Sequence, residues 1–286
     1  MAQRPNNSFK MLGGHVPVHY DRKPPNFGLG TRGTPGTWHC TTSFEKKLDN
    51  CFVELWEKCP LGKADVICTA GAWVNKSGMH GMGRAFDLDA IFWGDRMVLA
   101  LNYPNDRIAY LGIESILRKH FGTVLNYAYN AAHRDHWHID DGTSVGFQTG
   151  SESRVKYLQM ALNDVFETEK RLEVDGAYGK NTRTAAREVL IELQLASSDE
   201  IASDSKLDQT LKRVWSQFLD ATAKRGLAVL KPAAAPEQVS ASKSLEDLYR
   251  VIKEVLGETE DRKRIETMLT TFVSHPEIDK VLGRSA

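Results

Sequence analysis

The chain has 286 residues, of which 41% are hydrophobic and 26% charged, an ordinary balance for a globular protein of two or three units. Its 37 Lys and Arg residues match its 37 Asp and Glu residues, so no bulk charge favours nucleic acid or an anionic membrane as a partner. The sequence has no run of about eighteen apolar residues, which excludes a membrane-spanning helix.

The first forty residues are rich in Pro, Gly and Asn and show no regular period. They predict an N-terminal arm, residues 1–40, that wraps on the first domain without being one of its elements. The amino terminus lacks the apolar segment of a secretion signal. We therefore expect synthesis in the cytoplasm without a signal peptide.

Helical and strand patterns alternate over the next hundred residues. The spacing of Thr42 and Glu45 is that of a capping box, and apolar residues at helical intervals predict a helix over 43–58. A short buried strand is predicted at 65–70 and a second helix at 105–121.

The segment 84–91 alternates, which predicts a strand with Phe86, Leu88 and Ala90 on one face and Asp87 and Asp89 on the other. Two further strands are predicted at 124–129 and 136–140. Residues 1–148 are therefore expected to form one α+β domain with a small, largely antiparallel sheet.

From residue 149 the pattern becomes helical, and it predicts an all-α three-helix bundle over 149–230. The composition of 231–243 is that of a linker, and 244–286 predict a helical hairpin. Such a small hairpin is expected to dock or self-associate. A secretion-apparatus or immunity protein is a candidate partner for it.

Four cysteines lie in the first quarter of the chain: Cys40, Cys51, Cys59 and Cys68. They are compatible with two disulfides, with a structural metal set or with four reduced thiols. Their spacings lack the paired C-x-x-C of a zinc knuckle, and without a secretion signal buried reduced thiols are favoured.

Two stretches carry the residues suited to metal chemistry. His80 and Asp87 stand seven residues apart, on a glycine-rich loop and on the polar face of the strand that follows it. His136 and His138 alternate in a later strand and so share one side. If the two strands are neighbours, His80, Asp87 and His138 meet as a His₂Asp set, which suits Zn²⁺ with an open position for water.

Asp135 is a carboxylate that stands shortly before His138, but in a regular strand it points away from His138. It serves as a base only if the segment begins in a turn or bulge, and otherwise His136 or His133 is the better base. Asp89 has two open interpretations: it orients a ligand histidine, or it is a solvated carboxylate at the rim.

The pattern His80-x-x-Gly83-x-Ala85-x-Asp87 with Asp135-His136-Trp137-His138 resembles the zinc peptidases of bacterial peptidoglycan, in particular the extensin-like carboxy-terminal domains. The resemblance covers residues 64–141. It implies zinc ligands His80, Asp87 and His138, a general base at Asp135 and a transition-state-stabilising His136.

Within and beside these motifs, candidates to hold a ligand or contact substrate are Arg84, Asp89, His133 and Trp137. Family members that recognise a free D-Ala terminus carry an arginine on the strand before the first motif, and residues 70–73 contain none. Both endopeptidase and carboxypeptidase activity therefore stay open.

The segment from Val155 to Ala185, with its Asp175-Gly176 turn, resembles the three-helix peptidoglycan-binding-like domain. Together the two resemblances imply a zinc-dependent peptidoglycan peptidase held on the bacterial cell wall. It would act at the wall or in the periplasm after phage-type or contact-dependent release. The alternatives are a non-catalytic zinc-containing wall-binding protein, as in the Hedgehog signalling fold, and a metal-dependent amidase that cuts between sugar and stem.

Overall fold

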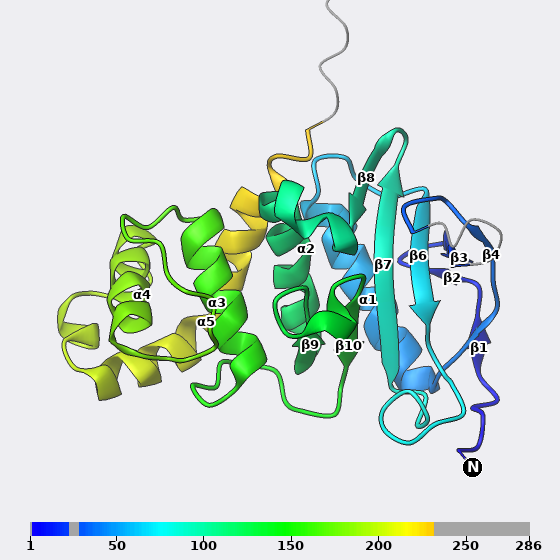
Figure 1. Cartoon of the computed structure of the whole chain (residues 1–286), viewed down its shortest axis with the longest axis horizontal. Coiled ribbons are helices and arrows are strands. Elements are labelled where there is room, and N and C mark those ends of the chain that lie inside the picture. Colours follow the sequence, from blue (N-terminus) through cyan, green and yellow to red (C-terminus); the bar gives the residue numbers. More distant parts are fainter. Residues whose placement is uncertain (1, 23–28, 232–286) are drawn as a thin grey trace, which may run out of the picture. The chain divides into compact units, whose positions relative to one another are not determined.

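The computed structural model describes residues 2–22 and 29–231, and these form one compact unit of helices and sheet up to Lys231 (Figure 1). The α+β class is thereby confirmed. The predicted hairpin 244–286, and the predicted linker beyond Lys231, lie outside the described residues. Within the described ranges no helix has both the length and the apolar character needed to span a membrane.

A mostly antiparallel sheet forms the centre of the unit. Its strand order is β2-β3-β6-β7-β10-β9, with β4 paired to β3 and β8 paired to β7. The strands are β2 (Met11–Leu12), β3 (Val16–Tyr20), β4 (Thr34–Pro35), β6 (Val66–Gly71), β7 (Ala85–Trp93), β8 (Arg96–Leu99), β9 (Thr123–Leu125) and β10 (Trp137–Asp140). A separate two-stranded ribbon joins β1 (Ser8–Phe9) to β5 (Trp38–His39).

The prediction that residues 1–40 stay outside the sheet was wrong. Strand β3 lies parallel to β6 within the main sheet, with Val18 opposite Ile67. Val16 and Val18 are buried, whereas Pro17 and His19 alternate with them on the other side. An alternation of only two valines among Pro and Gly residues is too short to predict a strand from the sequence. The segment is a strand because it pairs with β6.

Two helices cover one face of the sheet: α1 (Thr42–Lys58) and α2 (Arg107–His120). Phe52 of α1 packs edge-on against Phe86 of β7 at 6.4 Å between ring centroids. The predicted helix over 43–58 is confirmed, but the cap lies one residue earlier than expected. The Oγ1 atom of Thr41 accepts from the backbone N–H of Phe44 at 3.3 Å.

A bulge interrupts the alternation of β7. Cys68 pairs with Ala90 and Thr69 with Leu88, so Asp89 has no partner on β6. Ala90 therefore joins a small apolar cluster with Val66, Cys68 and Phe92, apart from the core that holds Phe86 and Leu88. The predicted common face of Phe86, Leu88 and Ala90 was wrong at Ala90, because a bulge reverses the alternation beyond it.

Three helices follow the sheet: α3 (Glu152–Asp164), α4 (Lys180–Glu192) and α5 (Asp204–Leu227). Short 3-10 turns lie at η1 (Ala100–Asn105), η2 (Ala131–His133) and η3 (Asp199–Ile201). Helices α2 and α5 touch backbone to backbone, since a Cβ placed on Gly226 would lie 2.5 Å from the Cα of Gly112. One continuous core thus runs from the sheet into these helices, and a module boundary at 148/149 stays a prediction.

All four cysteines are buried and free, as the interpretation of reduced thiols expects. Burial raises the pKa of Cys40 to about 12, and Glu45 acts in the same direction. Burial likewise raises the pKa of Cys51 well above its ordinary value. These thiols are therefore core side chains rather than thiolate ligands.

Candidate metal centre

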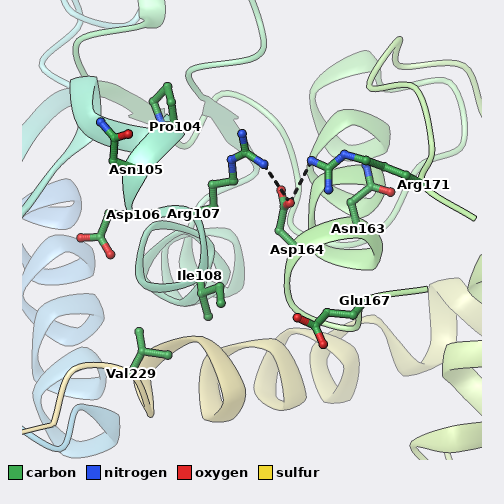
Figure 2. A pocket seen from close by; sticks show the side chains of 10 residues that line it. All are labelled: Pro104, Asn105, Asp106, Arg107, Ile108, Asn163, Asp164, Glu167, Arg171 and Val229. Atoms are coloured by element: carbon green, nitrogen blue, oxygen red, sulfur yellow. Dashed lines mark hydrogen bonds and ion pairs between the residues drawn. The ribbon is translucent and has the colours of Figure 1, made fainter. Parts of the chain in front are cut away.

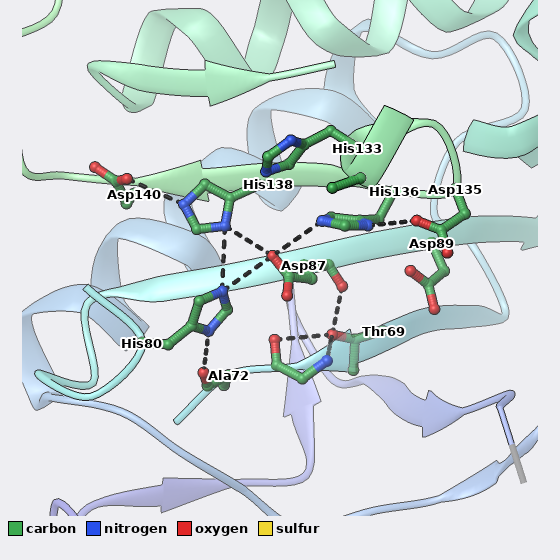
Figure 3. Close-up of polar contacts among 12 residues, drawn as sticks. Thr69, Ala72, His80, Asp87, Asp89, His133, Asp135, His136, His138 and Asp140 are labelled. Atoms are coloured by element: carbon green, nitrogen blue, oxygen red, sulfur yellow. Dashed lines mark hydrogen bonds and ion pairs between the residues drawn. The ribbon is translucent and has the colours of Figure 1, made fainter. Parts of the chain in front are cut away.

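The three predicted ligands meet on the face of the sheet opposite α1 and α2 (Figure 3). His80 lies in the loop between β6 and β7, Asp87 lies on β7, and His138 lies on β10. Asp87 and His138 are direct cross-strand partners, so their side chains project from the same face. β7 and β10 are neighbours, as the prediction required. This is why Asp87 and His138, 51 positions apart in the sequence, lie side by side.

The three side chains direct one atom each to a common point. His138 Nδ1 lies 2.8 Å from Asp87 Oδ1, and His80 Nε2 lies 3.1 Å from both of these atoms. Ligands of a tetrahedral zinc at about 2.0–2.1 Å from the ion are about 3.3 Å apart. The triangle is thus close to the size that a Zn²⁺ ion requires, and its His₂Asp chemistry fits that ion.

The outer nitrogen of each histidine is held by an oxygen. The carbonyl of Ala72 accepts from His80 Nδ1, and the carboxylate of Asp140 accepts from His138 Nε2 at 3.1 Å. An N–H that donates outward leaves the inner nitrogen with its lone pair directed at the centre. This is the arrangement that fixes the tautomer of metal-binding histidines.

Glycines allow the loop to bring His80 to the strand. A Cβ on Gly81 would lie 1.7 Å from the backbone oxygen of Lys76, so no other residue fits there. Gly83 has φ +66° and would meet Pro5 at 2.5 Å. The glycine-rich composition of this loop therefore has a structural reason at both positions.

The charges around the triad favour a cation. Burial alone would lower the pKa of His138, but hydrogen bonds to Asp140 and Asp87 raise it to about 9. Burial would raise the pKa of Asp87, yet His138 and His80 hold it well below its ordinary range. The centre therefore keeps a carboxylate ionised and retains positive charge, as a proton or as a metal ion.

His136 lies beside the triad, immediately before β10. Its Nε2 is 3.6 Å from Asp87 Oδ1, and its Nδ1 donates to Asp135 Oδ1 at 2.7 Å (Figure 3). Residues 134–136 form a bend rather than a strand. The bend meets the condition set above for Asp135 to act as a base. Its Oδ1, however, accepts from Nδ1 of His136, the ring nitrogen that lies away from the triad.

Arg22, two residues after the end of β3, contacts both Asp135 and Asp89. Its Nη1 donates to Asp135 Oδ2 at 3.0 Å, and its Nε and Nη2 grip Asp89 at 2.8 and 2.6 Å. Asp89 is fully buried, so the interpretation of a solvated rim carboxylate was wrong. Both oxygens of Asp89 accept from Arg22 and neither accepts from His80 or His138, so Asp89 does not orient these histidines.

Arg22 and Asp140 were absent from the predicted site. Asp140 could have been found, because it stands two residues after His138 and alternation places both on one face. Arg22 lies 67 residues from Asp89 and 113 from Asp135, in a segment interpreted as an arm, so no local pattern signals it.

The other candidates lie at different distances from the triad. The His133 ring lies 5.2 Å from that of His136 and 5.8 Å from that of His138, and burial with these neighbours lowers its pKa to about 4. Arg84 binds Asp141 at 2.7 Å, away from the triad. Trp137 is fully buried and stacks on Tyr110 at 4.2 Å, so it is a core residue and does not contact substrate.

Comparisons with family models, with curated proteins and with solved structures find no match for this chain.

Proposed function

We propose that this chain is a zinc-dependent peptidase that hydrolyses peptide bonds in the stem or cross-links of bacterial peptidoglycan. The observation that carries the proposal is the triangle of His80 Nε2, Asp87 Oδ1 and His138 Nδ1, with both outer imidazole nitrogens held by oxygens. The substrate class comes from the resemblance of the two motifs to wall peptidases and of residues 155–185 to a wall-binding module.

Held by His80, Asp87 and His138, a zinc ion would supply a Lewis acid able to polarise the scissile carbonyl and to lower the pKa of water. The protein's own part is to place acid and base groups around that point. His80, Asp87 and His138 would hold the ion as a three-residue set of the kind that catalytic zinc sites use.

His136 is the residue best placed to move the proton. Its Nδ1–H donates to Asp135, which leaves the lone pair of Nε2 on the side of the triad. Asp135 stabilises the imidazolium that forms when His136 takes a proton from water, as a carboxylate does behind a catalytic histidine. His136 then hands the proton to the leaving amine.

Asp135 is thus a positioning carboxylate, because both of its oxygens are already engaged, by His136 and Arg22. This assignment differs from the role of direct base that the family pattern implies for it. His133, whose lowered pKa keeps it neutral, lies at the rim as a hydrogen-bonding group for substrate.

The test is digestion of purified sacculi by the zinc-loaded chain, with the released fragments identified by mass spectrometry. We expect new peptide ends, abolished in His80→Ala together with bound zinc. His136→Ala should retain zinc but lose at least about a hundredfold in rate. Arg84→Gln, at the residue immediately before β7, where the arginine binds Asp141 away from the triad, is the matched control.

Two results would replace the proposal with its alternatives. Zinc and sacculi binding without any cleavage would indicate a non-catalytic wall-binding protein. Fragments whose masses show a cut between sugar and stem would indicate an amidase.

A further inference from the structure

A polar hollow of about 200 Å³ lies along β9. One water molecule needs about 10–15 Å³ of such space, so the hollow has room for a small group such as a carboxylate together with water. Its walls come from the β9 strand, from the loop before α3 and from the first turn of α3. They include Thr123, Leu125, Tyr129, Gln148, Ser151 and Arg154.

This hollow, the Arg154 pocket, opens on the same side of the sheet as the triad. Leu125 stands directly opposite His138, and Thr123 stands opposite Asp140. Directly opposed residues of antiparallel strands project to the same face, and the strands are about 4.8 Å apart. Tyr129 gives a second link, since its ring meets the edge of His133 at 5.7 Å.

Arg154 is the unusual residue of the pocket. It is only 4% exposed, and its Nη2 donates to the carbonyls of Gly122 at 2.7 Å and Ser144 at 2.6 Å. Among the described residues no carboxylate pairs with it, and its Nε and Nη1 atoms donate no hydrogen bond. A guanidinium stays charged in proteins, so the pocket contains a cation that lacks a counter-charge from the described part of the chain.

The other charges near the pocket do not neutralise Arg154. Glu152 is the acid of the lining, and it pairs with Lys156 at 2.7 Å. Arg118, which lies near Arg154, is itself paired with Glu114 at 2.7 Å. Buried charge is costly unless it is paired, and the unused donor edge of Arg154 is therefore suited to an anion.

A second hollow of the same unit shows the contrast (Figure 2). It also contains arginines, but Arg107 and Arg171 both lie on Asp164, at 3.6 and 2.9 Å. Their charge is satisfied within the protein. The Arg154 pocket differs in having donors without acceptors.

We infer that the Arg154 pocket binds a carboxylate of the peptide substrate, beside the bond that is cut. A guanidinium edge pairs with a carboxylate through two parallel hydrogen bonds, which gives both affinity and orientation. The ligand class is a peptide whose carboxylate, at its carboxy terminus or on a side chain, lies within about one residue of the scissile bond. This identification of the ligand as substrate rests on the proposed function, whereas the anion site itself does not.

The experiment is calorimetric titration of the full chain with three small probes. N-acetyl-D-alanine carries a terminal carboxylate, N-acetyl-D-glutamic acid α-amide carries only a side-chain carboxylate, and N-acetyl-D-alaninamide carries none. Each titration is repeated on chelator-treated protein, because a carboxylate could also bind a metal ion. We expect at least one acid probe to bind with and without metal, about tenfold or more tighter than the amide.

Variants assign the binding to this residue. Arg154→Gln should weaken the acid probe about tenfold or more, and Arg171→Gln should leave it unchanged. Arg154→Lys keeps a cation for the Gly122 and Ser144 carbonyls but lacks the forked edge, so a loss of about fivefold is expected even if Arg154→Gln fails to fold. Equal binding of acid and amide, or unchanged affinity in Arg154→Lys, would overturn the inference.

The outcome is separable from that of the proposed function. A chain that binds the acid probe through Arg154 but cuts no peptidoglycan would refute the peptidase and leave the anion site standing. A chain that cuts peptidoglycan but binds acid and amide alike would refute only the anion site.

Discussion

A proton and a metal ion compete for the same nitrogen of His138. Its Nε2 is committed to Asp140, so Nδ1 must lose its proton before it can bind zinc. In the metal-free protein the hydrogen bonds to Asp140 and Asp87, acting against burial, raise the pKa of His138 to about 9. The metal affinity of the centre should therefore depend on pH.

We expect the zinc dissociation constant to fall by up to about tenfold per pH unit from pH 7 to about pH 9, and then to level off. Because the folded pKa is raised, the stability that His138 gives the metal-free protein is complete below its unfolded value of about 6.5 and is lost as pH rises through 9. Chelator competition measures the first effect and thermal unfolding of the metal-free chain the second. Asp140→Asn should move the levelling point to lower pH, and a dissociation constant that is flat over this range would contradict the assignment.

Arg22 acts on His136 through Asp135 and does not contact the triad. We expect Arg22→Gln to lower kcat about ten- to a hundredfold and to leave KM and zinc content nearly unchanged, as for groups that orient a catalytic imidazole. Asp135→Asn should give a similar loss, and the double variant should lose little more, since both act through one imidazole.

The control for Arg22 is Arg32→Gln, an arginine from the same N-terminal part of the chain that contacts Asp65 instead. Arg22→Lys should recover part of kcat. Additive losses in the double variant, or a fall in zinc content, would show that Arg22 has only a structural role.

At the scale of residues, local spacing was sufficient to select the three members of the triad. His80, Asp87 and His138 stand on a loop and two strands, and the prediction that they meet required those strands to be neighbours, as β7 and β10 are. The partners that tune them depend on contacts across the sheet, and Arg22 is visible only once β3 is placed beside β6. Local spacing therefore predicts the candidate ligands better than it predicts the groups that orient them.

Elements with a clear period were predicted within a few residues, as for α1 and α2. Strand β3 and the bulge of β7 were missed for one physical reason. Both are defined by pairing with β6, a partner distant in sequence, so neither changes the local hydrophobic pattern in a recognisable way.

The contact between α2 and α5 gives a prediction at this scale. Gly226 looks like a weak point of α5, and by helix propensity alone Gly226→Ala would stabilise by about 1 kcal/mol. The added Cβ would instead lie 2.5 Å from the Cα of Gly112, and its other near neighbours are also backbone atoms of α2. Overpacking costs about 1–3 kcal/mol, and because backbone yields less than side chains we expect a net loss of about 1–2 kcal/mol.

Urea unfolding of Gly226→Ala against the parent chain measures this difference. Gly150→Ala is the control, because a Cβ there has no heavy atom within 4 Å. An increase in the free energy of unfolding for Gly226→Ala would mean that α2 and α5 do not touch at these glycines.

At the scale of the whole molecule, sequence pattern and packing divide the chain differently. The change from mixed to helical periodicity near residue 149 predicts two modules. The packed core instead continues from the sheet through α2 into α3 and α5, and Arg118 of α2 donates to the backbone of Ser153 at 3.0 Å. A periodicity shift marks a change of secondary structure, but it does not record which surfaces later pack together.

Truncation tests whether the chain has two modules or one continuous core. A chain of residues 1–148 would expose the α2 surface around Gly112 and leave Lys119 without Asp220, its partner on α5 at 2.7 Å. Because stability is only a small fraction of the total packing energy, we expect this fragment to lack a cooperative thermal transition and to bind zinc weakly. Residues 1–231 should melt in one transition and bind zinc like the full chain, as near-UV circular dichroism and chelator competition would show. A sharp transition with full zinc affinity in 1–148 would instead show that the sheet region is an independent domain and that α5 only covers it.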